Sequence, residues 1–318
     1  MKHLFTATLL IFLIPFAHSY AMESDVDRPF EELAVEAEIQ LRGQNAVYGY
    51  GALWQKGGFT VKRIDAETYA VTEIPLPDAS QRQRGLAVGE DAVWIADVGK
   101  KVIFRIDPTS NEVTLEIPAD MSSRTSDIEV GDGSVWAMVV GADGFEKTLA
   151  RFDAENGALQ ATVELPSATL GMVFGNESIW VVSGEKGQLY RVDVATNTLV
   201  ATTKLGDSPA YAAFGAGAVW VHDRGDATVR RIDGETGKVL AIIDTELPYG
   251  SSYVAFGGGF LWMNAYRRVA VLMIDPATNT VLRRYPSPPL LRFNKLAYGD
   301  GSLWLGGDKS ILRVAPPE

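Results

Sequence analysis

Seven tryptophans recur along the chain at almost constant intervals, and this spacing restricts the possible folds more than any other feature. The successive intervals are 40, 42, 44, 40, 42 and 42 residues. A glycine stands five residues before each tryptophan, and Leu, Val or Ile stands directly before it. The tryptophans are Trp54, Trp94, Trp136, Trp180, Trp220, Trp262 and Trp304. A period sustained over the whole chain is typical of a fold whose units pack on their neighbours.

One unit can be followed along residues 86–117. Short apolar or alternating segments are separated there by turn residues, as expected of strands. The segments are 86–88, 93–95, 102–107 and 113–117. Four strands in about 42 residues make one blade of a β-propeller. The sequence therefore predicts an all-β, seven-bladed β-propeller of four-stranded blades. Because no linker interrupts the repeat, residues 22–318 are expected to form a single domain.

The last unit lacks a fourth strand, because the chain ends soon after Val314. Residues 35–41 alternate between apolar and polar side chains at a period of two, as an outer strand does. We therefore expect this N-terminal strand to complete the last blade and close the ring, which also covers an open sheet edge. The charged segment 22–31 has no such pattern and is expected to contribute little to stability.

A second motif recurs in the third strand, where Arg, an apolar residue and Asp are followed by turn residues. The motif begins at Arg63, Arg105, Arg151, Arg191 and Arg231, and it weakens to Met273-Ile274-Asp275 in the sixth unit. An Asp side chain at such a position accepts hydrogen bonds from backbone N–H groups of the turn. We interpret this motif and the tryptophans as structural, not as parts of a binding site.

The first 21 residues predict a secretory signal peptide. Lys2 and His3 precede an apolar run over residues 4–16, and Ser19-Tyr20-Ala21 supplies a small-x-small cleavage site. The run is shorter than the roughly 18 residues that cross a bilayer. The mature protein is therefore expected in the periplasm or outside the cell, without a membrane span. It would contain no cysteine and one histidine, His222.

Charge is distributed unevenly along the chain. The formal net charge of −11 argues against nucleic acid as a partner. Yet the irregular loops, which a propeller places on one face, contain 15 Lys and Arg against 11 Asp and Glu. We expect the protein to be a monomer. Its cationic face predicts an anionic small molecule or peptide as ligand at the mouth of the central channel. The candidate binding residues are Arg84, Arg124, Tyr211, Arg224, Tyr253 and Arg292.

Catalytic signals are few. The sequence contains no metal-ligand cluster, phosphate-binding loop or nucleophile elbow, so no cofactor is evident. His222 precedes Asp223 at the expected start of a loop, and a His beside a carboxylate can act as a general base. The other interpretation is a loop histidine bonded locally to Asp226 or to the backbone. A third possibility is an assembly scaffold without a ligand.

The tryptophan motif, the Arg-Ile-Asp motif and turns such as Asp275-Pro276-Ala277-Thr278-Asn279 together resemble the virginiamycin B (streptogramin) lyase-like and YVTN-type β-propellers. The resemblance covers roughly residues 44–315 and implies the propeller fold. Lyases of this family open a cyclic depsipeptide by elimination, with a histidine base near a glutamate and with Mg²⁺.

This chain departs from the lyase pattern just before the innermost strands. No base stands five residues before any motif glycine, and no Glu-x-His occurs. The residues at these positions are Gln44, Arg84, Ser126, Leu170, Ala210, Ser252 and Asn294. A lyase or hydrolase with His222 as base is the alternative to a binding protein, and Mg²⁺ or Ca²⁺ would follow from the resemblance alone.

Overall fold

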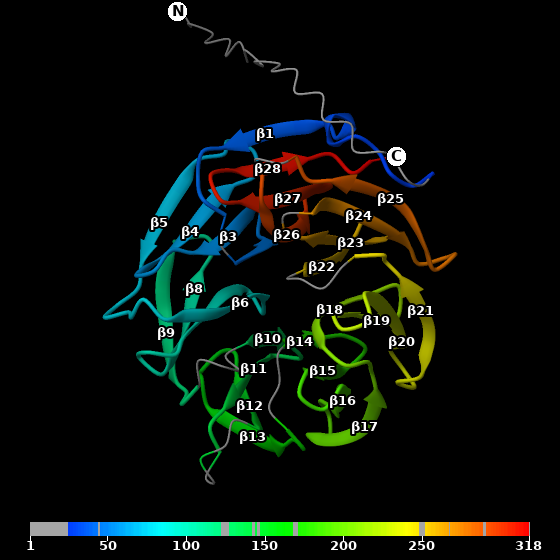
Figure 1. Ribbon diagram of the computed structural model, residues 1–318. Coiled ribbons are helices and arrows are strands. Elements are labelled where there is room, and N and C mark those ends of the chain that lie inside the picture. The colour runs from blue at the N-terminus through cyan, green and yellow to red at the C-terminus, as the bar shows by residue number, and fades with distance from the viewer. Residues whose placement is uncertain are drawn as a thin grey trace, which may run out of the picture.

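The chain folds into seven four-stranded antiparallel sheets arranged around a common axis (Figure 1), which confirms the predicted seven-bladed propeller. The computed structural model describes residues 25–43, 45–121, 127–141, 144, 147–167, 171–247, 252–266, 268–288 and 291–317. One short 3-10 helix, η1 (Phe30–Glu32), precedes the first strand. Within these described ranges, no helix is long and apolar enough to cross a bilayer.

The first six blades each use four consecutive strands, the first of which lies innermost. Blade 1 contains β2 (Ala46–Gly49), β3 (Ala52–Lys56), β4 (Thr60–Asp65) and β5 (Val71–Pro75). Blade 2 contains β6 (Gln83–Gly89), β7 (Ala92–Asp97), β8 (Val102–Asp107) and β9 (Glu112–Pro118). Blade 3 contains β10 (Ile128–Gly131), β11 (Ser134–Val139), β12 (Thr148–Asp153) and β13 (Leu159–Glu164).

The remaining blades follow the same order. Blade 4 contains β14 (Gly171–Phe174), β15 (Ser178–Ser183), β16 (Gln188–Asp193) and β17 (Thr198–Lys204). Blade 5 contains β18 (Pro209–Gly215), β19 (Ala218–Asp223), β20 (Thr228–Asp233) and β21 (Val239–Asp244). Blade 6 contains β22 (Ser252–Gly257), β23 (Phe260–Ala265), β24 (Val269–Asp275) and β25 (Thr280–Pro286). Blade 7 contains β26 (Phe293–Gly299), β27 (Ser302–Gly307), β28 (Ile311–Val314) and β1 (Val35–Ile39).

Blade 7 is closed by the N-terminal strand, as predicted. β1 pairs antiparallel with β28, from Val35 opposite Val314 to Ile39 opposite Ile311. Figure 1 shows β1 as the outermost strand beside the C-terminal strands. This pairing joins the two ends of the chain and covers the edge of β28.

The residues before β1 make more contacts than the sequence pattern suggested. Asp27 bridges Arg284 of β25, and backbone hydrogen bonds of 2.9 Å join Arg28 and Val26 to the same residue. Phe30 stacks on Phe293 with ring centroids 5.7 Å apart. The expectation that segment 22–31 contributes little is therefore wrong for residues 26–30, because their backbone and Phe30 pack against blades 6 and 7.

Each motif tryptophan links its own blade to the next one. In all seven blades the indole N–H donates to the carbonyl oxygen of the glycine five residues earlier, at 2.9–3.4 Å. The rings are fully buried, and some stack on an aromatic side chain of the following blade, as Trp220 does on Phe256 at 6.3 Å. The repeat spacing thus records inter-blade packing, as expected for a propeller.

The motif glycines are required by the neighbouring blade more than by the turn. The positive φ values of this turn fall mostly on the two residues after the glycine, such as Glu90 and Asp91 at 52° and 53°. A Cβ on Gly131 would lie 2.4 Å from the Phe174 ring of the next blade. Only a residue without a side chain lets the neighbouring inner strand approach this closely.

The arginine of the third strand also acts between blades. In six blades its guanidinium lies 5.0–5.8 Å from the motif tryptophan ring. Arg231, for example, donates to the Pro276 carbonyl oxygen of blade 6 at 2.6 Å. The sixth blade has Met273 here because blade 7 takes its outer strand from the other end of the chain and has no such turn to hold.

The aspartate of this motif caps its own turn, as predicted. Asp233 accepts hydrogen bonds from the backbone N–H groups of Glu235 and Thr236 at 3.3 and 2.7 Å. Asp65 does the same in blade 1, and the hydrogen bonds from Thr68 lower the pKa of its carboxyl to about 2. These residues are structural.

Candidate functional site

The candidate site is built where the inner strands begin, on the same end of every blade. Two sequence positions of each repeat lie side by side there. One is four residues before the motif glycine, and the other is two residues after the tryptophan. They are cross-strand partners, as in Tyr211 opposite His222, Tyr253 opposite Asn264 and Lys295 opposite Gly306. Because side chains alternate along a strand, both positions share the tryptophan's face and lean toward the next blade.

Three side chains at these positions form a continuous row across blades 5, 6 and 7. The Tyr211 and Tyr253 rings lie 4.6 Å apart. Lys295 places its amine 3.7 Å from the centroid of the Tyr253 ring and donates a hydrogen bond to its hydroxyl. Asn264 holds Tyr253 and Lys295 together. Its side chain accepts a hydrogen bond from the Tyr253 backbone N–H at 3.0 Å and donates one to the Lys295 carbonyl at 3.2 Å.

Lys295 continues this row into blade 1. Its Cβ lies against Gly306, and Gly306 lies against Gly43, whose backbone N–H donates to Gly307 at 2.8 Å. Any side chain at position 43 or 306 would separate these segments. Burial and, as the smaller cause, the nearby Lys56 ammonium together lower the pKa of the Lys295 amine to about 8.

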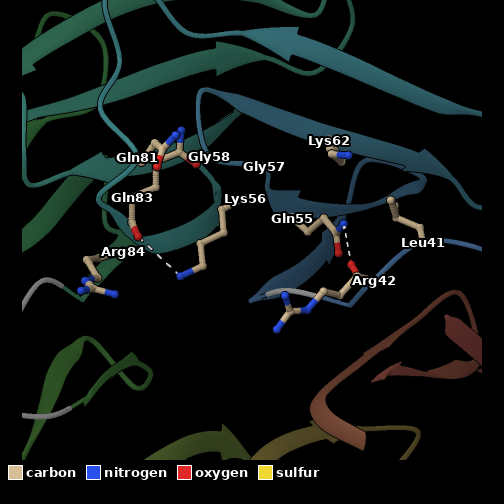
Figure 2. A pocket seen from close by; sticks show the side chains of 10 residues that line it. All are labelled: Leu41, Arg42, Gln55, Lys56, Gly57, Gly58, Lys62, Gln81, Gln83 and Arg84. Carbon is tan, nitrogen blue, oxygen red and sulfur yellow. Dashed lines mark hydrogen bonds between the residues drawn. The ribbon is translucent and has the colours of Figure 1, made fainter. Parts of the chain in front are cut away.

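A cavity of about 420 Å³ opens beside blade 1 (Figure 2). Its wall combines the chain before β2, the β3–β4 turn and the chain entering β6, and the described residues that line it include four cationic side chains and no acidic one. The lining residues are Leu41, Arg42, Gln55, Lys56, Gly57, Gly58, Lys62, Gln81, Gln83 and Arg84. Figure 2 shows the Lys56 amine directed toward the segment of Gln83 and Arg84, with Arg42 on the other side of the opening.

Most of this positive charge is uncompensated by the described part of the chain. Lys62 pairs with Glu73 at 2.8 Å, whereas no ion pair with a described residue holds Arg42, Lys56 or Arg84. Among the residues that the structure places, the Lys56 amine donates to the Gln83 carbonyl alone, at 3.4 Å. Burial and then the charge of Arg84 lower the pKa of Lys56, as expected where two cations share a partly dry wall.

A buried amide completes the wall. Gln83 is 3% exposed, and neither its Nε2 nor its Oε1 has a hydrogen-bond partner among the described residues. Leaving both ends of a buried amide unpaired costs free energy, about 1–3 kcal/mol per group. Such a residue on a cavity wall can donate to or accept from a bound molecule.

Two carboxyl groups lie on blade 3, the neighbour of blade 2. Asp127 accepts a hydrogen bond from the backbone of Met172 at 3.3 Å, and burial raises the pKa of its carboxyl to about 6. Burial also raises the pKa of Glu129, to about 8. Cations therefore gather on blades 1, 2 and 7, and protonatable acids gather on blade 3.

His222 is not the loop residue that the sequence suggested. It lies within β19, is 2% exposed, and pairs across the sheet with Tyr211. Its Nδ1 has no hydrogen-bond partner in the described part of the protein, and Asp226 bonds Arg230 and Thr228 instead. Burial lowers the pKa of the imidazole to about 4, so the ring is neutral at pH 7.

The six predicted binding residues are distributed over several blades. Arg84 lines the cavity, and Tyr211 and Tyr253 face each other. Arg224 donates to the Ser208 hydroxyl at 3.3 Å, and Arg292 is exposed just before β26. Arg124 and the signal segment 1–21 lie outside the described residues.

Sequence reasoning missed Arg42, Lys56, Gln83 and Lys295 in this site. It compared the residues five positions before each motif glycine, whereas the side chains that meet between blades lie one residue later. The signal was present in the repeat. At that later position, and two residues after the tryptophan, polar side chains such as Lys56 and Lys295 replace the small or apolar residues of other blades.

The described donors do not form a metal site. Among the residues that the structure places, no three His, Cys, Asp or Glu side chains converge as metal ligands. The carboxylate ligands that Mg²⁺ or Ca²⁺ prefers are thus not assembled among these residues.

Comparison with known proteins supports the fold. No family model matches the chain, and no curated protein matches it in sequence. Solved structures do match. A streptogramin B lyase superposes with a TM-score of 0.72 at 17% identity, over 87% of this chain and 96% of the lyase. The virginiamycin B lyase of Staphylococcus aureus gives 0.69 at 17% identity, over 90% and 98%.

A propeller of another kind matches equally well. The WD40 propeller domain of Doa1 gives a TM-score of 0.69 at 10% identity, over 90% of this chain and 98% of that domain. At such identities the likeness extends to architecture and not to activity. The chain is a seven-bladed β-propeller with structural similarity to virginiamycin B lyase at low sequence identity.

Proposed function

We propose that this protein is an exported propeller that binds an anionic small molecule or peptide at the end of the axis where the inner strands begin. The observation that carries the proposal is the cavity of blade 1, whose described lining residues include four cations and no acid. Three of those cations have no ion-pair partner among the described residues. A protein of net charge −11 that leaves cations facing one another gains free energy when an anion joins them.

The chemistry of the wall favours carboxylate or phosphate groups. The guanidinium groups of Arg42 and Arg84 offer planar pairs of N–H donors, which match such groups. Lys56 adds a point charge, and the Gln83 amide adds a neutral donor and acceptor. The paired rings of Tyr211 and Tyr253, connected to this wall through Lys295, offer a surface for a flat or apolar part of the ligand.

A thermal-shift screen with anionic metabolites and acidic peptides tests the proposal. Arg84 is exposed, so Arg84→Glu should fold normally, since exposed loop substitutions seldom cost more than about 0.5 kcal/mol. It should weaken every genuine ligand more than tenfold. Lys238→Glu makes the same charge change in an exposed turn at the opposite end of its blade. If Lys238→Glu weakened the ligands as much as Arg84→Glu, only overall charge would matter and the proposed site would be wrong.

The lyase or hydrolase with His222 as base remains the alternative proposal. No contact of the described residues favours it, since the imidazole is buried behind Tyr211 and its pKa is low. His222→Gln should leave ligand binding unchanged in the binding-protein proposal. Conversion of a screened ligand by the wild type, lost in His222→Gln, would establish the enzyme instead.

A further inference from the structure

Lys295 differs from the other lysines of the site in its surroundings. Its stem packs against Gly306, its amine contacts the hydroxyl and the ring face of Tyr253, and it is half-buried. No carboxylate in the described part of the protein forms an ion pair with it. A second amine, that of Lys56, lies close enough to repel its positive charge.

These conditions favour the neutral, nucleophilic form of an amine. A lysine becomes a nucleophile at ordinary pH when it is desolvated or placed beside another cation, because both effects disfavour the ammonium form. The pKa of about 8 agrees with this geometry. The pKa of Tyr253 is strongly raised by burial, so its hydroxyl stays protonated and does not act as an anion that would hold the ammonium.

We infer that Lys295 is a nucleophilic amine that forms a reversible imine with small carbonyl compounds carrying an anionic group. The inference rests on the proposed function, because the anionic group would be held by Arg84 and Lys56 of the adjoining cavity. The compounds that fit are 2-oxo acids and aldehydes bearing a carboxylate or phosphate.

The reaction balances without any further reagent. The lone pair of Lys295 Nζ attacks the carbonyl carbon, and the carbonyl oxygen takes up a proton to give a carbinolamine. The nitrogen then releases one proton, the hydroxyl takes up another from solvent and leaves as water, and the lone pair of the nitrogen closes the C=N bond to give a protonated imine. Release of the remaining N–H proton to solvent gives the neutral imine. The net change is amine plus carbonyl to imine plus water, with no change of oxidation state.

The position of Lys295 explains why an anion should assist the attack. Gly43 and Gly306 bring the segment of Arg42 directly beside Lys295, and Lys56 lies between Lys295 and Arg84 in the row of contacts. A carboxylate bound by these cations places its neighbouring carbonyl near the amine, which raises the effective concentration of the two reactants.

Reductive trapping on the whole purified protein tests this inference. Glyoxylate, the smallest aldehyde with a carboxylate, is added with cyanoborohydride at pH 8, and modified lysines are quantified by peptide mass spectrometry. Lys295 should gain a carboxymethyl group at least tenfold faster than the exposed Lys186. Its rate should rise with pH up to about 8 and then level off, as the neutral form becomes dominant.

Matched variants separate the inference from the proposed function. Lys295→Arg keeps the charge beside Tyr253 and removes the nucleophile, so the fast adduct should disappear. The thermal shift of the wild type with a non-carbonyl anion reports the proposed function separately. Arg84→Gln should slow trapping by glyoxylate about tenfold and leave trapping by acetaldehyde unchanged. Fast modification by both aldehydes, insensitive to Arg84→Gln, would keep the nucleophile and overturn the anion-guided part. Modification of Lys295 no faster than that of Lys186 would overturn the inference itself.

Discussion

At the scale of residues, the residues that recur in every repeat are those that form the contacts between blades. The tryptophan, the glycine five residues before it and the arginine of the third strand all contact the following blade. The sixth blade is the exception. It has Met273 in place of the arginine, because blade 7 has no turn between its third and fourth strands to which an arginine could donate. The sequence motif repeats because the interfaces between neighbouring blades are packed in the same way.

The glycine in this arrangement can be tested by adding one carbon. In Gly175→Ala the new Cβ would lie 2.1 Å from the Phe214 ring, so the two blades must separate or the ring must turn. Overpacking of this kind costs about 1–3 kcal/mol. Urea unfolding should show that loss, and combining the change with Phe214→Ala should cost less than the two single changes summed. A variant as stable as the wild type would contradict the packing explanation.

The buried histidine predicts a dependence of stability on pH. The pKa of His222 is about 4 in the folded protein against about 6.5 when unfolded. As pH falls from 6.5 to 4, the imidazole takes up a proton in the unfolded chain but not in the native protein. The free energy of unfolding therefore falls by up to about 3 kcal/mol. Above pH 6.5 the residue contributes no pH dependence.

The measurement is the difference between the unfolding free energies of wild type and His222→Gln across this range. Subtracting the variant removes the contribution of other groups such as Asp127 and Glu129, whose raised pKa values act in the opposite direction. The difference should slope between pH 4 and 6.5 and level off above it. A flat difference would mean that His222 has the same pKa in the folded and the unfolded protein, which would contradict the lowered value.

At the scale of elements, period-two alternation predicted the strands and the ring closure, because one face of each strand must be buried. The same regularity could not reveal the site. The site depends on which of two adjacent residues, such as Arg84 or the residue that follows it, directs its side chain toward the next blade. A bulge between Gln83 and Leu86 changes the direction of these side chains, and the sequence pattern does not show it. The contacts of residues 26–30 were equally hidden, since backbone pairing with Arg284 needs no pattern in the side chains.

Truncation tests the two N-terminal segments separately. A chain that begins at residue 32 loses the bridge of Asp27 to Arg284 and the stacking of Phe30, and it should be measurably less stable than one that begins at residue 22. A chain that begins at residue 43 also loses β1, exposes the edge of β28 and should lose several kcal/mol more, on the scale of a few buried side chains.

Melting temperatures of the three chains provide the measurement, and Phe30→Ala in the longest chain isolates the aromatic contact. We expect three separate values in the order of length. Equal values for the two shorter chains would mean that β1 does not close the ring.

At the scale of the whole molecule, the inner ends of the blades form a row that turns from cationic to acidic around the axis. Arg84 and Lys56 lie on blades 2 and 1, the Tyr211–Tyr253 pair lies on blades 5 and 6, and Asp127 lies at the start of blade 3, which packs against blade 2. In the proposed function, an anion is attracted to the cationic part of this ring. Because screening weakens such attraction, binding should decline as ionic strength rises.

The structure of the protein with the strongest anionic ligand from the screen tests the central claim most directly. The account predicts the anionic group within hydrogen-bond distance of Lys56 and Arg84, in the cavity of blade 1. A ligand bound at the opposite end of the propeller, or on the outer strands with the cavity unoccupied in the same crystal, would contradict it.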